Sequence, residues 1–393
     1  NPSTTTDFKT VDVDGRISVT PKVKSFYDGT DKLEGEPLPQ SVKDQFVNLE
    51  NLRGRLAASV AYDESGLKIV VDMFSYDEDG RVKTRYQFVP GSGLRWVTYK
   101  YGLQGNVLTA TPNGVAARTK KYEYDDNARL VLFKFNNRNI SKNQYDSKGR
   151  LFQKTFHSGS GSTPFEAIQF DYNIRDWTVQ ISMPQMFSER LYYEEKDWDG
   201  GGAIAAPLHS GNISAISFSQ SGVAAQKLDY KYDKASRLIA VEDNTSDTEN
   251  FNEAFAYHKD GRLLKKGKGV SDPALVTQQY EYGQVPTTTS ANNQLQRIDK
   301  HPTKGSVKNF VYDPNGNFCI DRSKNMVIVS DWRDMPVAFK FYKSLPTKIG
   351  TADLAWNNIS GLNEEDLVSE VRMVYDASGN RVSKSEIKGP AAQ

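Results

Sequence analysis

The chain has 393 residues, and its 50 lysines and arginines nearly balance 49 aspartates and glutamates, for a formal net charge of +1. Binding to a polyanion needs a concentrated basic face, and no block of like charge stands out, so nucleic acid is not an expected partner. The single cysteine, Cys319, excludes an internal disulfide framework and a paired-cysteine zinc site. The four histidines are well separated, so we expect no metal site, no cofactor and no catalytic residue.

No stretch approaches the roughly 18 apolar residues that a membrane-spanning helix needs, so we expect no membrane insertion. The first thirty or so residues lack the charged and then apolar pattern of a signal peptide. If the protein is exported, its targeting signal is expected outside this chain.

In chain order, residues 1–58 are the least regular and are expected to form an irregular lead-in with a short helix over Ser41 to Asn51. Residues 59–388 are expected to form an array of β-hairpins, with longer inserts near 175–220 and 330–367, and residues 389–393 form a tail. The second insert begins with Asp331-Trp-Arg-Asp-Met-Pro336, which resembles a degenerate repeat, and contains Asn363-Glu-Glu-Asp366, expected as a loop or short helix.

The array is defined by a short internal repeat, which is sought first because missing it would misassign the whole fold. The segment Tyr76-Asp-Glu-Asp-Gly-Arg-Val82 recurs at a loose spacing, in copies that begin at Tyr124, Tyr145, Tyr232, Tyr257, Tyr312 and Tyr375. Weaker copies begin at Tyr62, Tyr101 and Tyr172, and Asp14-Gly-Arg-Ile17 is a partial copy. The repeat residues expected to be structural are Tyr76, Asp77, Gly80, Arg81, Tyr124, Asp125, Arg129, Tyr145, Asp146, Gly149, Arg150, Tyr232, Asp233, Arg237, Tyr257, Gly261, Arg262, Tyr312, Asp313, Gly316, Tyr375, Asp376 and Gly379.

Each copy predicts a β-hairpin. Aromatic and polar residues alternate before the turn, as in Lys121-Tyr-Glu-Tyr-Asp125, which is the two-residue period of a half-buried strand. The aspartate can accept from backbone N–H groups two residues on, and the glycine supplies the positive φ of a turn with a bulge. The arginine is expected to lie over an aromatic face or to pair with a carboxylate. Ala128 and Ser236 replace the glycine, so those two turns are expected to change type or to carry strain.

The repeated Tyr-Asp-x-x-Gly-Arg-Leu copies resemble the YD repeats of the RHS family, which also occur in teneurins and in the shell components of Tc toxin complexes. The match covers roughly residues 60–385, and its repetition makes it specific. Segments similar to those of RHS-repeat proteins from the Bacteroidetes are Tyr172-Asn-Ile-Arg-Asp-Trp177, Phe187-Ser-Glu-Arg-Leu-Tyr192, Gly211-Asn-Ile-Ser214 and Leu345-Pro-Thr-Lys348.

The resemblance implies an all-β fold in which tandem hairpins form a long, curled or spiralling antiparallel sheet, part of a hollow cocoon. It implies a secreted or cell-surface protein that encloses or displays a cargo such as a C-terminal toxin of the polymorphic kind. The implied partners are the remainder of a larger chain or a capping protein, the cargo, and a secretion machinery. The family's self-cleaving aspartates are not recognised here, and Asp313-Pro-Asn-Gly-Asn317 is interpreted as an ordinary turn.

Two other functions remain open from the sequence. A cell-surface adhesin or carbohydrate-binding scaffold would use exposed aromatic rings, for example Trp177, Trp198 and Trp356, and would need them to face solvent. A glycosidase would need paired carboxylates about 5 to 10 Å apart. The candidates for that pair are Glu194, Glu195, Asp197 and Asp199, for which a solvated acidic loop is the simpler interpretation.

Overall fold

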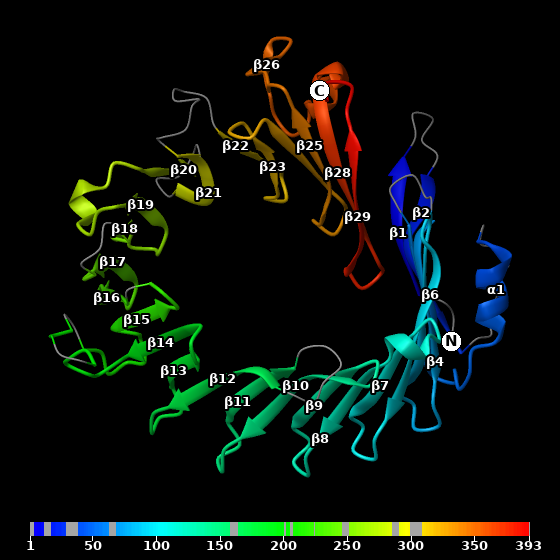
Figure 1. The fold of residues 1–393 in the computed structure, drawn as a ribbon. Helices are drawn as coiled ribbons and strands as arrows, with labels where there is room; N and C mark the ends of the chain where they lie inside the picture. Colours follow the sequence, from blue (N-terminus) through cyan, green and yellow to red (C-terminus); the bar gives the residue numbers. More distant parts are fainter. Residues whose placement is uncertain are drawn as a thin grey trace. The chain divides into compact units, whose positions relative to one another are not determined.

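The computed structural model describes residues 4–11, 17–28, 38–62, 68–157, 164–199, 202–204, 207–223, 225–245, 251–284, 291–298 and 309–392. Within this part of the chain, strands β1 to β19 belong to one 19-stranded antiparallel sheet in which consecutive strands pair. Figure 1 shows neighbouring strands such as β10, β11 and β12 lying side by side. The expected fold class, an all-β array of tandem hairpins in a long antiparallel sheet, is confirmed.

The chain divides into two compact units, which are described separately. Unit 1 comprises residues 1–129, 134–137 and 312–393, and unit 2 comprises residues 130–133 and 138–311.

The elements of unit 1 are β1 (Thr4–Val11), β2 (Ile17–Tyr27), α1 (Gln40–Val47), β3 (Leu56–Tyr62), β4 (Lys68–Tyr76), β5 (Val82–Val89), β6 (Gly93–Tyr101), β7 (Val107–Pro112) and β8 (Lys120–Tyr124), followed after unit 2 by β22 (Phe310–Tyr312), β23 (Phe318–Asp321), β24 (Met326–Ser330), β25 (Pro336–Tyr342), β26 (Lys348–Ile349), β27 (Ala352–Asp353), β28 (Leu367–Tyr375) and β29 (Arg381–Lys388). Short 3₁₀ turns lie at Ala116–Arg118, Ile359–Gly361 and Glu364–Asp366. Strands β22 to β25, β28 and β29 form a separate six-stranded sheet.

The elements of unit 2 are β9 (Leu130–Phe135), β10 (Arg138–Tyr145), β11 (Leu151–His157), β12 (Pro164–Tyr172), β13 (Thr178–Met183), β14 (Phe187–Tyr192), β15 (Ala215–Gln220), β16 (Gln226–Tyr232), β17 (Leu238–Asp243), β18 (Glu253–Tyr257), β19 (Leu263–Lys268), β20 (Tyr280–Gln284) and β21 (Ala291–Ile298), with a 3₁₀ turn at Pro273–Leu275. Two residues at the end of β9 and part of β22 fall across the unit boundaries. Strands β20 and β21 form a two-stranded sheet.

The main hydrophobic core of unit 1 lies between α1 and the sheet. Val42 and Phe46 of α1 are buried against Phe26, Val60 and Met73, and the rings of Phe26 and Phe46 meet edge to face at 6.2 Å. Figure 1 shows α1 alongside the strands of this part of the sheet. Because the helix is only eight residues long, it depends on this packing for its stability.

The described part of residues 1–58 is more regular than the sequence indicated. Strands β1 and β2 pair with each other, and β2 pairs with β3, so the expected lead-in takes part in the sheet. The helix expected over Ser41 to Asn51 is α1, which spans Gln40–Val47. The turn of the partial copy at Asp14-Gly-Arg lies outside the described residues. Within the described part, the longest helix has eight residues, too short to cross a membrane.

Unit 2 has smaller cores beneath the loop that joins β14 to β15. Tyr192 and Trp198 pack edge to face, with ring centroids 5.0 Å apart, in a cluster with Ile204 and Ala215. These satellite cores hold the first insert against the sheet.

Candidate functional site

The repeated turn is the most regular feature of the structure, so the site is built from it. In each copy whose turn the structure describes, the backbone N–H of the aspartate position donates to the carbonyl of the residue four positions on, for example from Asp146 to Arg150 at 2.9 Å. The turn of the weak copy at Tyr62 lies outside the described residues. The Asp146 carboxylate accepts from the backbone N–H groups of Lys148 and Arg150, both at 2.9 Å. Its second oxygen accepts from Nε of Arg150 at 2.7 Å. The aspartate therefore closes the turn and holds the arginine at its base.

The same closure occurs where the sequence motif is weak. The aspartate position is filled by Gly102, Asn173, His258 and Asp331 in four such turns, and each donates to the carbonyl four residues on. The segment that begins at Asp331 therefore makes a repeat turn, although no tyrosine precedes it.

The fourth turn residue adopts a left-handed conformation in all of these turns that the structure describes. Gly149 has φ of 87°, and the non-glycine residues Ala128 and Ser236 take the same region, at 60° and 59°. These two turns therefore keep the common geometry and carry the strain of a side chain at positive φ.

We expect Ala128→Gly to stabilise the local hairpin by about 0.5 to 1 kcal/mol, because glycine removes this strain. The matched control is Gly105→Ala, at the same turn position, where an added Cβ meets no atom within 4 Å. It should destabilise its hairpin by a similar amount through backbone strain alone. Amide hydrogen exchange in the flanking strands measures both effects, and a destabilising Ala128→Gly would contradict the strain.

Successive repeats are joined through the tyrosine that precedes most of the described turns. Its hydroxyl donates to the carbonyl of the first residue after the preceding turn, for example from Tyr172 to Leu151 at 2.8 Å. The same bond links Tyr76 to Leu56, Tyr101 to Val82, Tyr124 to Val107, Tyr145 to Leu130, Tyr193 to Thr178, Tyr232 to Ile213, Tyr282 to Leu263 and Tyr375 to Pro336.

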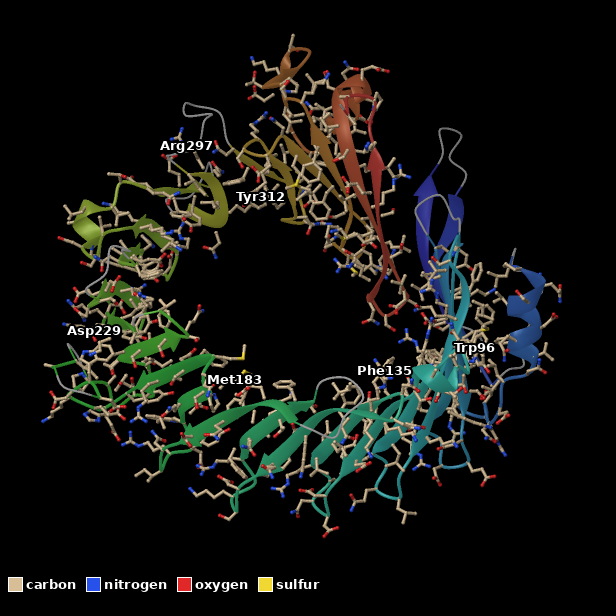
Figure 2. The ribbon with its side chains drawn as sticks, viewed as in Figure 1. Trp96, Phe135, Met183, Asp229, Arg297 and Tyr312 are labelled. Atoms are coloured by element: carbon tan, nitrogen blue, oxygen red, sulfur yellow. The ribbon has the colours of Figure 1, made fainter. Side chains whose placement is uncertain are left out.

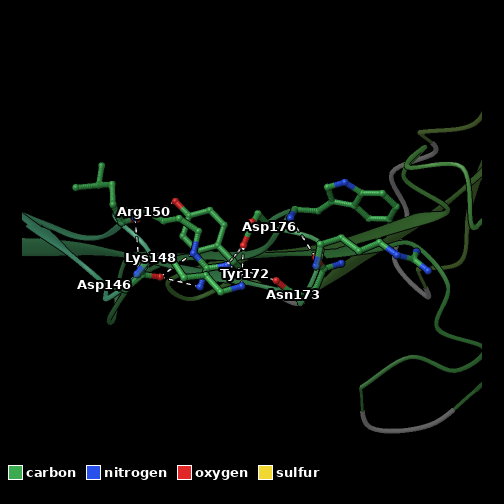
Figure 3. A network of polar contacts seen from close by, with 9 residues as sticks. Asp146, Lys148, Arg150, Tyr172, Asn173 and Asp176 are labelled. Atoms are coloured by element: carbon green, nitrogen blue, oxygen red, sulfur yellow. Dashed lines mark hydrogen bonds and ion pairs between the residues drawn. The ribbon is translucent and has the colours of Figure 1, made fainter.

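In four turns the arginine reaches forward to the tyrosine of the next repeat. Figure 3 shows Arg150 lying over the ring of Tyr172, with its guanidinium carbon 4.7 Å from the ring centroid. Its Nη1 donates to the carbonyl of Asn173 at 3.4 Å and pairs with the carboxylate of Asp176. Arg81, Arg237 and Arg262 lie over the tyrosines of their next repeats in the same way. These four links therefore combine an ion pair within one turn with a cation–π contact to the next repeat.

We expect Tyr172→Phe to lower the stability of the β11–β12 pairing by about 1 kcal/mol, the usual net value of one hydrogen bond. The chain has two units, so a single global unfolding curve is unsuitable and local amide exchange is the proper measurement. Tyr99→Phe is the control, because its hydroxyl has no hydrogen-bond partner in the described part of the chain. Equal effects of the two substitutions would contradict the role of the hydroxyl.

The turn carboxylates are stabilised in their charged form. The backbone N–H and then the guanidinium of Arg150 lower the pKa of Asp146, and the side chain and then the backbone of Arg129 lower the pKa of Asp125. A lowered carboxyl pKa contributes stability that is present above the ordinary value of about 3.9 and is lost as the pH falls through the lowered value.

Carbon-13 NMR of the carboxyl groups should therefore show Asp146 titrating below the ordinary range. In Arg150→Met the pKa of Asp146 should rise part of the way toward the ordinary aspartate value, since the backbone N–H groups remain. An unchanged Asp146 titration in that variant would contradict a role for the guanidinium.

A second polar cluster in unit 1 joins two segments that are 291 residues apart. Arg85 donates through Nη2 to Asp72 at 2.9 Å and to Asp376 at 3.1 Å. Both carboxylates are buried, and burial raises the pKa of Asp72 against the opposing effect of Arg85. Asp376 is also the turn aspartate of the last repeat copy, where it accepts from the backbone N–H of Asn380 at 2.8 Å.

Comparison with known proteins agrees with this architecture. No family model matches the chain, and no curated protein matches it. Solved structures do match: the crystal structure of TcdB2-TccC3-TEV superposes with a TM-score of 0.57 at 12% identity, over 96% of this chain and 18% of that chain. The Photorhabdus luminescens Tc holotoxin pore, with a D651A substitution in its TccC3, gives 0.56 at 11% identity, over 97% and 20%. This chain shares their fold.

A third structure, of TcdB2-TccC3-Cdc42, gives a TM-score of 0.50 at 11% identity over 97% of this chain. The chain spans about a fifth of the length of these matched chains. At the level of fold, this agrees with the RHS resemblance carried by the sequence motifs.

The tryptophans proposed as sugar platforms do not form a row of solvent-facing rings. Trp198 is buried in the unit 2 core, and Trp177 packs on Tyr193 with ring centroids 4.9 Å apart. Trp356 is 46% exposed. Burial of Trp198 and the packing of Trp177 remove the expected support for an adhesin at these residues.

Two of the four acidic residues proposed for a glycosidase, Glu194 and Glu195, serve local contacts. Glu194 pairs with Arg175 at 2.8 Å and with His209 at 3.0 Å, and both partners lower its pKa, His209 more than Arg175. Glu195 accepts from the backbone N–H of Tyr193. In the described part of the chain, no group of three or more histidine, cysteine, aspartate or glutamate side chains is arranged to hold a metal ion.

Proposed function

We propose that this chain is a structural segment of an RHS-type shell, which encloses or displays a polypeptide cargo such as a toxin. The observation that carries the proposal is the repeated link in which one repeat supplies an arginine and a carbonyl, and the next supplies the tyrosine. The most regular polar residues of the chain are thus engaged in fastening repeat to repeat. A protein shell requires such contacts between its repeats and requires no catalytic residue.

The proposal includes no catalytic activity for this chain itself. In four turns the aspartate pairs with the arginine of its own turn, and Glu194 of the first insert pairs with Arg175. Cys319 is buried, and burial raises the pKa of its thiol to about 12, which disfavours the reactive thiolate.

The partners that accompany this function are the remainder of a larger chain or a capping protein, the cargo, and a secretion machinery. A sheet edge that is left open exposes unpaired backbone groups, so a neighbouring protein segment is expected to cover it. A secreted or cell-surface location follows from the family resemblance, which points to the Bacteroidetes.

The test is protease protection of the natural full-length protein, purified from its source. A shell predicts that a polypeptide segment outside residues 1–393, or a co-purifying protein, resists protease until denaturant opens the array. Mass spectrometry of the protected fragments identifies the segment. If every segment outside the array is cut as fast as a free peptide, and no protein co-purifies, the shell function is wrong.

A further inference from the structure

Unit 1 contains a groove on the sheet face opposite α1. It has a volume of about 520 Å³ and runs across β5, β6 and the end of β7. Three arginines, Arg85, Arg95 and Arg118, line it, and no carboxylate does.

The strand register places the lining residues on one face. Gln87 pairs across the ladder with Arg95, and Arg85 pairs with Val97, which in turn pairs with Pro112. Directly paired residues point to the same side of a sheet. Their neighbours in sequence, such as Tyr86, point to the other side and pack against the core around α1.

Two of the three arginines are available to a ligand. Arg85 is held between Asp72 and Asp376, which neutralise it. Arg95 and Arg118 are exposed, and neither has an ion-pair or hydrogen-bond partner for its side chain among the described residues. A groove with two unpaired guanidinium groups and no acidic residue in its lining favours an anionic ligand, and the planar guanidinium suits carboxylates.

The remaining lining favours a polypeptide over a sugar chain. Val97 and Pro112 offer aliphatic surface, whereas sugar recognition relies on aromatic platforms. The ring of Trp96, labelled in Figure 2, packs against Tyr86 at 6.3 Å and thus belongs to the opposite face. Tyr99 is then the one aromatic ring of this lining that lies on the groove face.

The groove also dictates how a peptide would lie. Strands β5 and β6 are paired on both sides, so their backbone groups are already hydrogen-bonded and cannot add the peptide as a further strand. Recognition must come from side chains, which suits a segment that is held without being drawn into the sheet.

We propose that this groove binds an acidic polypeptide segment, with aspartate or glutamate carboxylates paired to Arg95 and Arg118 and aliphatic groups on Val97 and Pro112. The assignment of this segment to an enclosed cargo rests on the proposed shell function. The affinity of the groove for an acidic peptide is independent of that function.

The test uses the whole chain and a fluorescein-labelled peptide of alternating glutamate and valine, followed by fluorescence polarisation at two salt concentrations. Arg95→Gln/Arg118→Gln should weaken binding about tenfold, since two exposed ion pairs are lost. Arg53→Gln/Arg138→Gln removes the same charge from two exposed arginines outside the groove and should leave the affinity nearly unchanged. Both double variants should fold, because the substituted side chains are exposed.

A charge swap adds a second readout. Arg95→Glu/Arg118→Glu should no longer bind the acidic peptide. It should instead bind a labelled peptide of alternating lysine and valine. Equal losses in the groove and control variants would overturn the site, as would preferential binding of an oligogalacturonate. Because these measurements use purified chain and synthetic peptide, a failed protease-protection test leaves their outcome unaffected, and the two proposals fail separately.

Discussion

Phe46→Ala should destabilise unit 1 by about 3 to 5 kcal/mol, the usual cost of removing a buried phenylalanine side chain. Phe46 is 6% exposed and packs on Phe26, so truncation leaves a cavity between α1 and the sheet. The adjacent Val47 is 82% exposed, and Val47→Ala should change stability by less than about 0.5 kcal/mol. Hydrogen exchange of the β2, β3 and β4 amides measures both variants.

If α1 contributed little to unit 1, the two substitutions would have equally small effects. That result would also undermine the assignment of the groove to the face left free by the helix. The comparison is well matched, because both residues lie in the last turn of the same helix.

Arg85→Met should destabilise unit 1 by about 2 kcal/mol or more, because it leaves two buried carboxylates without their common partner. The figure is below the usual range for a fully buried pair since the Arg85 side chain is 38% exposed. Arg95→Met is the matched control: it lies on the same face in the next strand and has no described partner. Adding Asp72→Asn to Arg85→Met should restore part of the lost stability, because it removes one of the two unpaired carboxylates.

The pH dependence of Arg85→Met gives an independent check. Burial raises the pKa of Asp72, so the folded state binds a proton more readily than the unfolded state does. The associated stability is present at low pH and is lost as the pH rises through the raised pKa. The loss of stability caused by Arg85→Met should therefore be larger at pH 7 than near pH 4. A deficit independent of pH would mean that the unpaired carboxylates are not its cause.

Turn chemistry made much of the fold predictable from sequence. The motif places the turn aspartate and the residue with positive φ within seven residues, so the hairpin at Tyr145 follows from local chemistry. The weak copies at Tyr101 and Tyr172 make the same turns, because Gly102 and Asn173 also supply the backbone N–H that closes them. The sheet then follows by repetition.

The contacts that join separate segments were harder to predict from the sequence. The sequence indicated that an arginine would meet a ring or a carboxylate. Arg150 meets both: it pairs with Asp146 of its own turn, and it also reaches a ring and a second carboxylate of the next repeat. Tyr193 takes the place of a repeat tyrosine without any motif after it. The contact between Arg85 and Asp376 depends on how distant strands meet, which local patterns do not encode.

The forward reach of each arginine gives the array a direction. Residues earlier in the chain present the guanidinium and the carbonyl, and residues later in the chain bring the tyrosine that occupies them. A growing polypeptide emerges in this order, so each new hairpin meets a docking surface that already exists. The array can thus assemble during translation by successive addition to one end, as expected where each repeat docks on the one before it.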